Sequence, residues 1–443
     1  MDMKKLFLAV LVIVSACTSQ DMIVIEETLS KNTNERSVLN TVDTLQVSRS
    51  SIRNFNEALQ VAQSSIAKIE SSTLKRTASP RRIDFGNTKI LKANTSNRSA
   101  NNTSDTLMYV FNFEENQGFA IVSADKNIIP LLAVTESGNY DPDMQTGIEG
   151  FDYYMEQLKN QLLRGPQNPT PIPGDFFDRD SIAYEPNYSL RNGPFLSVRW
   201  GQQYPEGEAC PNGLCGCTNT AIAQIMSYYE YPDSISITCI GSSPFIQTLN
   251  WQQMKNHSTG HSYYYCPTPT VHSSIFYLLR QLGQMNNSIY GYDSYLNPFT
   301  GTEKGPVIST MTNLGYSTGN WEDFNFPQAK SQLDSLHLLL MAGLQSFVGH
   351  MWVFDGYMPV EKINYHLSPI GIDGAYIITE VINMGIAYYY CHYNWGYYGI
   401  CNGYFLPGVF SLNNASVYDQ PGSNNIQENY NIEVSFLPIY HCE

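Results

Sequence analysis

The residues with the clearest chemical potential begin at a cysteine. Cys217 follows Gly216 and precedes apolar residues that recur at helical spacing. These apolar residues are Ala221, Ile222, Ile225, Met226 and Tyr229. The pattern predicts a buried helix with Cys217 in its first turn, where unpaired N–H groups and the helix dipole stabilise a thiolate. A free thiol has a pKa of about 8.5, and such a setting lowers it to roughly 3.5–7.5. This favours a nucleophile, the alternative being a structural cysteine packed at a helix start.

A nucleophilic cysteine needs a base, and the base needs an orienting group. His350 precedes an apolar run at residues 351–354 that is typical of a central strand, and Asn394 follows an aromatic-rich run. We expect His350 to pair with Cys217 and act as base and then acid, while Asn394 fixes the tautomer of His350. Trp395 is expected to shield that hydrogen bond from water, with ordinary core packing as its alternative role. The other seven histidines are interpreted as structural: His257, His261, His272, His337, His366, His392 and His441.

An oxyanion donor is expected upstream of the cysteine. Gln202 lies fifteen residues before Cys217 and close to Pro205. Its amide N–H and the backbone N–H of Cys217 are predicted to bind the developing oxyanion, and one such donor contributes on the order of 3–4 kcal/mol. Gln203 is the alternative donor. Asp355 is interpreted either as a group that supports the catalytic residues from behind or faces the substrate, or as a solvated or strand-capping aspartate, and the sequence leaves these open.

These motifs occur in a recognisable order over about residues 195–410. They are Trp-Gly-Gln-x-x-Pro from Trp200, Gly-Cys-x-x-Thr-Ala-x-Ala-Gln-Ile-Met from Gly216, Tyr231-Pro232, Gly-His-x-x-Val-x-Asp-Gly from Gly349, and Asn-Trp-Gly-x-x-Gly from Asn394. The arrangement resembles the streptopain family of papain-clan cysteine peptidases. The resemblance implies an α+β fold with a two-lobed papain-like catalytic domain over residues 191–443, peptide-bond hydrolysis, and no metal or organic cofactor. The chain departs from the family pattern at Tyr397, at Met351-Trp352 and in the loop 206–214.

The N-terminal half predicts a second, smaller α+β domain. An amphipathic helix is expected over 51–69, strands over 107–113, 119–123 and 128–134, and a helix over 143–164. Ser123-Ala124-Asp125 resembles the end of a strand pair in the streptopain propeptide. The resemblance implies an inhibitory propeptide domain over 51–165, the alternative being a permanent accessory domain. Residues 72–105 are interpreted as a polar loop and 166–190 as a linker with the maturation site.

The first residues predict export. Lys4 and Lys5 precede an apolar run at 6–14 that is too short to span a bilayer. Residues 1–17 are therefore predicted to be a lipoprotein signal peptide that makes Cys17 the lipidated N-terminus, with an ordinary secretory signal as the alternative. Residues 18–50 are interpreted as a flexible tether. The expected location is the cell envelope or outside the cell, anchored to a bacterial membrane by lipid.

Charge and the remaining cysteines limit the partners. The chain has a net charge of −15, and residues 181–443 hold 7 Lys+Arg against 18 Asp+Glu, which disfavours nucleic acid. Outside the cytoplasm the remaining cysteines can pair, and the pairs considered are Cys391/Cys401, Cys210/Cys215 and Cys239/Cys266. Unpaired buried thiols are the alternative. The spacing of Cys210, Cys215 and Cys217 does not suit a zinc ribbon or finger.

The sequence therefore predicts a secreted, lipid-anchored cysteine endopeptidase made as a zymogen. Its expected partners are protein or peptide substrates, its own propeptide as an inhibitor, and a membrane through the lipid anchor. One alternative is a catalytically silent surface lipoprotein that binds a protein or peptide through the same groove. Another is a transglutaminase or amidase of the same clan, which the propeptide-like block disfavours.

Overall fold

The computed structural model describes residues 52–71, 81–93, 106–126, 128–164, 180–238, 243–258, 269–345, 348–370, 375–410 and 433–441. The predicted signal peptide, its lipidation site Cys17, and the tether lie outside these residues.

The N-terminal domain packs two helices against a small antiparallel sheet. Its elements are α1 (Phe55–Ser71), β1 (Ile83–Lys92), β2 (Thr106–Phe113), β3 (Phe119–Ser123), β4 (Leu131–Thr135) and α2 (Glu149–Arg164). The predicted α1, β2–β3 hairpin and third strand are confirmed, while α2 begins at Glu149 rather than near residue 143. The interpretation of 72–105 as a loop is wrong at β1, which pairs antiparallel with β2. Most residues of β1 are partly or fully exposed, so this edge strand lacks the apolar alternation that marks a strand in the sequence.

The C-terminal domain has a helical lobe followed by a sheet lobe. Its helices are α3 (Cys217–Tyr229), α4 (Trp251–Ser258), α5 (Pro269–Met285), α6 (Lys304–Asn313) and α7 (Phe326–Asp334). Its main strands are β12 (Leu338–Gln345), β13 (Val348–Ile370), β14 (Ala375–Asn394), β15 (Gly403–Phe405) and β16 (Glu433–Tyr440). Shorter strands are β6 (Ser234–Ile237), β7 (Phe245–Thr248), β8 (Ile289–Tyr292), β9 (Pro298–Gly301), β10 (Ser317–Thr318) and β11 (Glu322–Asp323). α7 ends at Asp334, and Leu338 already belongs to β12.

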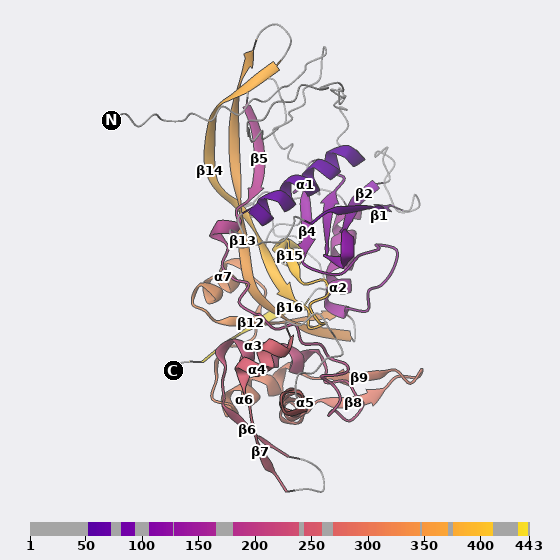
Figure 1. The fold of residues 1–443 in the computed structure, drawn as a ribbon, viewed down its shortest axis with the longest axis vertical. Coiled ribbons are helices and arrows are strands. Elements are labelled where there is room, and N and C mark those ends of the chain that lie inside the picture. The colour runs from indigo at the N-terminus through magenta and orange to yellow at the C-terminus, as the bar shows by residue number, and fades with distance from the viewer. Residues whose placement is uncertain are drawn as a thin grey trace, which may run out of the picture.

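One large sheet runs through both domains. Its order is β1-β2-β3-β4-β15-β14-β13-β12-β16-β10, so β4 of the N-terminal domain pairs with β15 of the C-terminal domain. Figure 1 shows the N-terminal strands beside β15, and β13 and β14 rising as a long arm above them. β5 (Asp180–Pro186) pairs with β13, so the later part of the segment interpreted as a linker, 166–190, forms a strand of the sheet.

Two apolar cores lie on the large sheet. One joins α3 and α5 to residues of β12, β13 and β16, including Leu340, Val353 and Leu437. The other joins the N-terminal domain to further side chains of the C-terminal strands, including Trp352 and Tyr393. The predicted α+β architecture, a two-lobed papain-like domain preceded by a small α+β domain, is confirmed.

The cysteine pairs that fall within the described residues are not formed. Cys210, Cys215, Cys391 and Cys401 are free thiols. The Sγ atom of Cys215 instead lies 3.2 Å from both the carbonyl oxygen of Gln202 and the hydroxyl of Thr220. Cys239 and Cys266 lie outside the described residues. Among the helices that the structure describes, none combines the length and the apolar character needed to cross a bilayer.

Candidate active site

Cys217 is the first residue of α3, as the sequence predicts. The preceding Gly216 has φ 86° and ψ 152°, a backbone conformation that other residues rarely adopt. A Cβ atom at Gly216 would also lie 2.8 Å from Cγ2 of Thr300, so glycine is required for space as well. The backbone N–H of Met351, next to His350 on β13, donates to Sγ of Cys217 at 3.4 Å. The predicted nucleophile and the predicted base are therefore brought to the same place by α3 and β13.

The Cys217 thiol is not activated in this structure. Burial raises its pKa, and the charge of Glu149 on α2 raises it further, while N–H groups of Met351 and Thr218 only partly oppose these effects. The expectation of a lowered pKa is wrong for this state, because the thiol is buried and Glu149 of the N-terminal domain adds a negative charge near it.

His350 is turned toward the N-terminal domain. Its Nε2 lies 3.1 Å from the carbonyl oxygen of Trp395, and its Nδ1 lies 3.5 Å from Oε2 of Glu149. Burial lowers the pKa of His350, with Glu149 and the Trp395 carbonyl opposing the shift. The raised pKa of the thiol and the lowered pKa of the imidazole both favour the neutral forms over a thiolate–imidazolium couple in this state.

Asn394 lies close by on β14 but makes other hydrogen bonds. Its Nδ2 donates to the carbonyl oxygen of Val198 at 3.2 Å, and its Oδ1 accepts from the N–H of Gly396 at 3.1 Å. The predicted bond from Asn394 to His350 is thus not formed here, because the imidazole is held by Trp395 and Glu149. Gly396 has φ 78°, a conformation that favours glycine and allows a tight turn after the strand.

Trp395 and two further rings form the wall around the imidazole. Trp395 is fully buried, and its indole N–H donates to the carbonyl oxygen of Cys401 at 3.0 Å. The ring centroids of Trp352 and Tyr397 lie 6.2 Å and 5.8 Å from that of His350, in stacked orientations. Trp352 and Tyr397, two of the residues at which the sequence departs from its family pattern, therefore both lie against the predicted catalytic histidine.

The start of α2 fits closely against this wall. A Cβ atom at Gly150 would lie 2.5 Å from Cδ2 of His350 and 2.7 Å from Cε3 of Trp395. Glu149 and Gly150 were not predicted to belong to the site. The one signal in the sequence was Gly150 itself. Glycine weakens a helix, so a glycine in a helical pattern can indicate that another group packs closely against the helix there.

Gln202 has the surroundings expected of an unused hydrogen-bond donor. Its side chain is 5% exposed, and its Nε2 has no hydrogen-bond partner among the described residues. Gln203 is exposed. A buried amide N–H without a partner costs free energy in the resting protein, so its retention near Cys217 fits a donor for a transient oxyanion.

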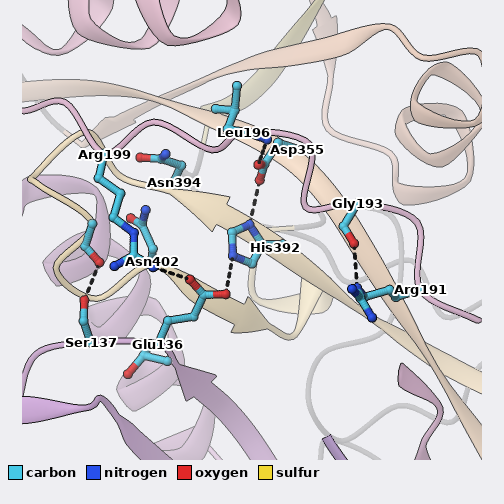
Figure 2. Close-up of polar contacts among 12 residues, drawn as sticks. Glu136, Ser137, Arg191, Gly193, Leu196, Arg199, Asp355, His392, Asn394 and Asn402 are labelled. Atoms are coloured by element: carbon cyan, nitrogen blue, oxygen red, sulfur yellow. Dashed lines mark hydrogen bonds and ion pairs between the residues drawn. The ribbon is translucent and has the colours of Figure 1, made fainter. Parts of the chain in front are cut away.

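Asp355 and His392 form a buried pair that the sequence analysis did not connect. Oδ1 of Asp355 lies 2.6 Å from Nδ1 of His392, and Oδ2 accepts from the N–H of Leu196 at 2.9 Å. Figure 2 shows this pair beside Glu136 and Arg199. Asp355 is therefore neither solvated nor a strand cap, which excludes that alternative.

Comparison with known proteins gives this arrangement a class. Residues 40–162 match the Spi protease inhibitor family and residues 199–405 match the Peptidase C10 family. Streptopain from Streptococcus pyogenes is 24% identical over 333 residues, covering 67% of this chain and 73% of that protein. The thiol protease/hemagglutinin PrtT from Porphyromonas gingivalis is 24% identical over 368 residues, covering 75% of this chain and 37% of that protein. A solved prointerpain A fragment from Prevotella intermedia is 18% identical with a TM-score of 0.46, covering 79% of this chain and 98% of that one.

The site, the match to the Peptidase C10 family and the similarity to two thiol proteases in sequence together define a cysteine-type peptidase. The chain is a homologue of streptopain in which a region that matches the Spi protease inhibitor family precedes a region that matches the Peptidase C10 family.

Proposed function

We propose that this chain is the latent precursor of a cysteine endopeptidase, exported and lipid-anchored through Cys17. The observation that carries the proposal of latency is the position of His350. Its imidazole is held between the Trp395 carbonyl and Glu149 of the inhibitor domain, beside a thiol whose pKa burial raises.

Removal of α2 would free both members of the catalytic pair. Without Glu149 and Gly150, the imidazole of His350 can turn from the Trp395 carbonyl toward Cys217 and accept its proton. The thiolate then attacks the scissile carbonyl carbon, and the oxyanion accepts hydrogen bonds from the Cys217 N–H and the Gln202 amide. The imidazolium of His350 protonates the leaving amine, and water releases the acyl group from sulfur.

Asn394 supports this cycle once His350 has turned. Its Oδ1 would accept from the second ring nitrogen, which fixes the tautomer that receives the thiol proton. Trp395 follows Asn394 in the sequence and is fully buried, and it would keep water from this hydrogen bond.

The proposed domain plan follows the predicted boundaries. Residues 51–165 form the inhibitory propeptide, 166–190 hold the maturation site, and 191–443 form the mature peptidase. The export and anchoring proposal is supported by the sequence alone, through Lys4, Lys5, the apolar run at 6–14 and Cys17.

Self-processing tests the proposal directly. The chain lacking residues 1–17 is incubated beside its Cys217→Ala variant, and both are followed on a gel with a thiol-directed active-site probe. The unmodified chain is expected to shorten to a fragment that starts near residues 165–200 and to take the label, while the variant stays full-length and unlabelled.

A different pattern would support the silent binding protein instead. If neither chain shortens, even after an added protease cuts the linker, and Cys217 takes no label, the proposal of a peptidase precursor is wrong.

A further inference from the structure

The inhibitor and peptidase domains are joined by a strand pair. The three residues of β15 pair antiparallel with β4 in the register Gly403↔Thr135, Tyr404↔Val134 and Phe405↔Ala133. The pairing continues beyond β4, where the N–H of Glu136 donates to the carbonyl oxygen of Asn402 at 2.8 Å and the N–H of Cys401 donates to that of Ser137 at 3.2 Å. We call residues 133–137 the docking strand.

The peptidase side is shaped for a backbone at this edge. A Cβ atom at Gly403 would lie 2.3 Å from the carbonyl oxygen of Val134, so a larger residue would force the two strands apart. The hydroxyl of Ser137 also donates to the carbonyl oxygen of Gly399 at 2.7 Å. Without the docking strand, β15 would present free N–H and C=O groups of the kind that bind an added strand.

One side chain of the docking strand enters a charged site on the peptidase domain. Oε1 of Glu136 lies 3.5 Å from Nε2 of His392, and Oε2 lies 3.4 Å from Nη2 of Arg199 (Figure 2). We call His392, Asp355 and Arg199 the carboxylate site. His392 comes from β14, Asp355 from β13 and Arg199 from the segment before α3, so all three belong to the peptidase domain.

Asp355 prepares His392 to bind an anion. Asp355 is fully buried and its carboxylate accepts from Nδ1, which leaves Nε2 facing Glu136. Burial alone lowers the pKa of His392, but Asp355 and Glu136 outweigh it and raise the pKa to about 10. His392 is 3% exposed, and its Nε2 makes no hydrogen bond to any described residue, so the ion pair with Glu136 is the interaction that compensates this buried nitrogen.

We propose that the docking strand is the recognition element of the inhibitor domain, with its Glu136 carboxylate in the carboxylate site and its backbone on β15. The Asp355–His392 pair lies entirely within the peptidase domain, so the carboxylate site and the β15 edge persist after maturation and rebind the docking strand of a second copy. The inference rests on the proposed function only in treating the N-terminal domain as a removable inhibitor.

Amide hydrogen exchange tests the proposal without any need for peptidase activity. Exchange is measured on the Cys217→Ala chain, with and without Glu136→Gln, at the two amides that join the domains beyond β4, Glu136 and Cys401. We expect Glu136→Gln to increase exchange at both amides on the order of tenfold or more. The matched control is Glu115→Gln, an exposed carboxylate of the same domain, which is expected to change nothing there.

The coupling between the two domains gives a second measurement. His392→Gln is expected to increase exchange as Glu136→Gln does, and the two together are expected to add little, because both remove the same ion pair. Unchanged exchange in Glu136→Gln overturns the proposal. Because Glu136 is partly exposed, this variant is expected to fold, and it tests the proposal even if His392→Gln does not fold. If Glu136→Gln opens the strand pair while the unmodified chain never processes itself or takes an active-site label, the docking site stands and the peptidase precursor does not.

Discussion

At the scale of single residues, Gln202 and Gln203 offer a matched comparison. They are neighbours of the same type, but Gln202 is buried with an unpartnered amide nitrogen and Gln203 is exposed. Replacing Gln202 by Ala is expected to lower kcat of the processed enzyme by about 10²–10³, because one oxyanion donor is lost. The measurement is steady-state hydrolysis of a peptide substrate, with a melting curve to show that the fold is kept.

Gln203→Ala is the control for that experiment and is expected to leave kcat within about twofold. The assignment of the oxyanion donor would be wrong if Gln203→Ala were the damaging change, or if Gln202→Ala hydrolysed the substrate at the unmodified rate.

The sequence predicted the positions of the site residues better than their contacts. Cys217 begins its helix, as the helical spacing of the apolar residues after it predicted. The hydrogen bonds of His350 depend on Glu149, about 200 residues earlier in the chain, and no local pattern reports such a contact. The pairing of Asp355 with His392 was missed for the same reason. Their contact arises from the alignment of β13 with β14, which no local pattern reports.

At the scale of elements, α2 is the part of the inhibitor domain that reaches the catalytic histidine. Gly150→Ala places a methyl group 2.5 Å from Cδ2 of His350, so α2 must withdraw or the imidazole must move. We expect this variant to react with a thiol-directed active-site probe faster than the unmodified chain, on the order of tenfold, since about 1.4 kcal/mol of lost docking corresponds to that factor. The measurement is the labelling rate of Cys217 before any processing.

The control for this prediction is a helical glycine with space around it. A Cβ atom at Gly305, on α6, meets no atom within 4 Å, so Gly305→Ala is expected to leave labelling unchanged and to stabilise the helix by about 0.5–1 kcal/mol. Equal labelling of the two variants would show that the close approach of α2 does not maintain latency.

Sequence patterns identified elements with strong periodicity and missed those defined by their partners. The helices α1 and α3 were predicted because their apolar residues recur at helical spacing. β5 and β1 were missed, since β5 lies on the edge of β13 and β1 on the edge of β2, where little apolar alternation is needed. The pairing of β4 with β15 joins segments about 270 residues apart, which no local signal predicts.

At the scale of the whole molecule, the inhibitor and peptidase domains share a core. Aromatic side chains of α2 pack on the peptidase sheet, with ring centroids 6.4 Å apart for Phe151 and Trp395 and 5.0 Å apart for Tyr154 and Phe405. Together with the continuous sheet, this shared core predicts that the precursor unfolds as one cooperative unit. The ion pair between Glu136 and His392 crosses the same boundary, so its protonation state bears on the stability of the whole precursor.

The pH dependence of that stability follows from the sign of each shift. Because the pKa of His392 is raised to about 10, its contribution is complete below about pH 6.5 and is lost as pH rises toward 10. Glu136 has its pKa lowered to about 2 by His392, Arg199 and Arg81 against the opposing effect of burial, so its contribution is lost as pH falls from about 4.5 toward 2. The carboxylate site is therefore expected to stabilise the precursor most between about pH 4.5 and 6.5.

Denaturant midpoints of the Cys217→Ala chain, measured from pH 6 to pH 10, test this expectation against the same chain carrying Asp355→Asn and His392→Gln together. The paired change removes both charges, so neither is left buried alone. The midpoint of the Cys217→Ala chain is expected to fall more steeply above pH 6.5, because only that chain loses a proton from a stabilising imidazolium. His337→Gln is the control. Burial lowers the pKa of His337, so this histidine loses no stabilising proton above pH 6.5 and its replacement is expected to leave the alkaline slope of the midpoint unchanged. Parallel curves for the Cys217→Ala chain and the paired variant would show that His392 does not carry its charge in the folded precursor.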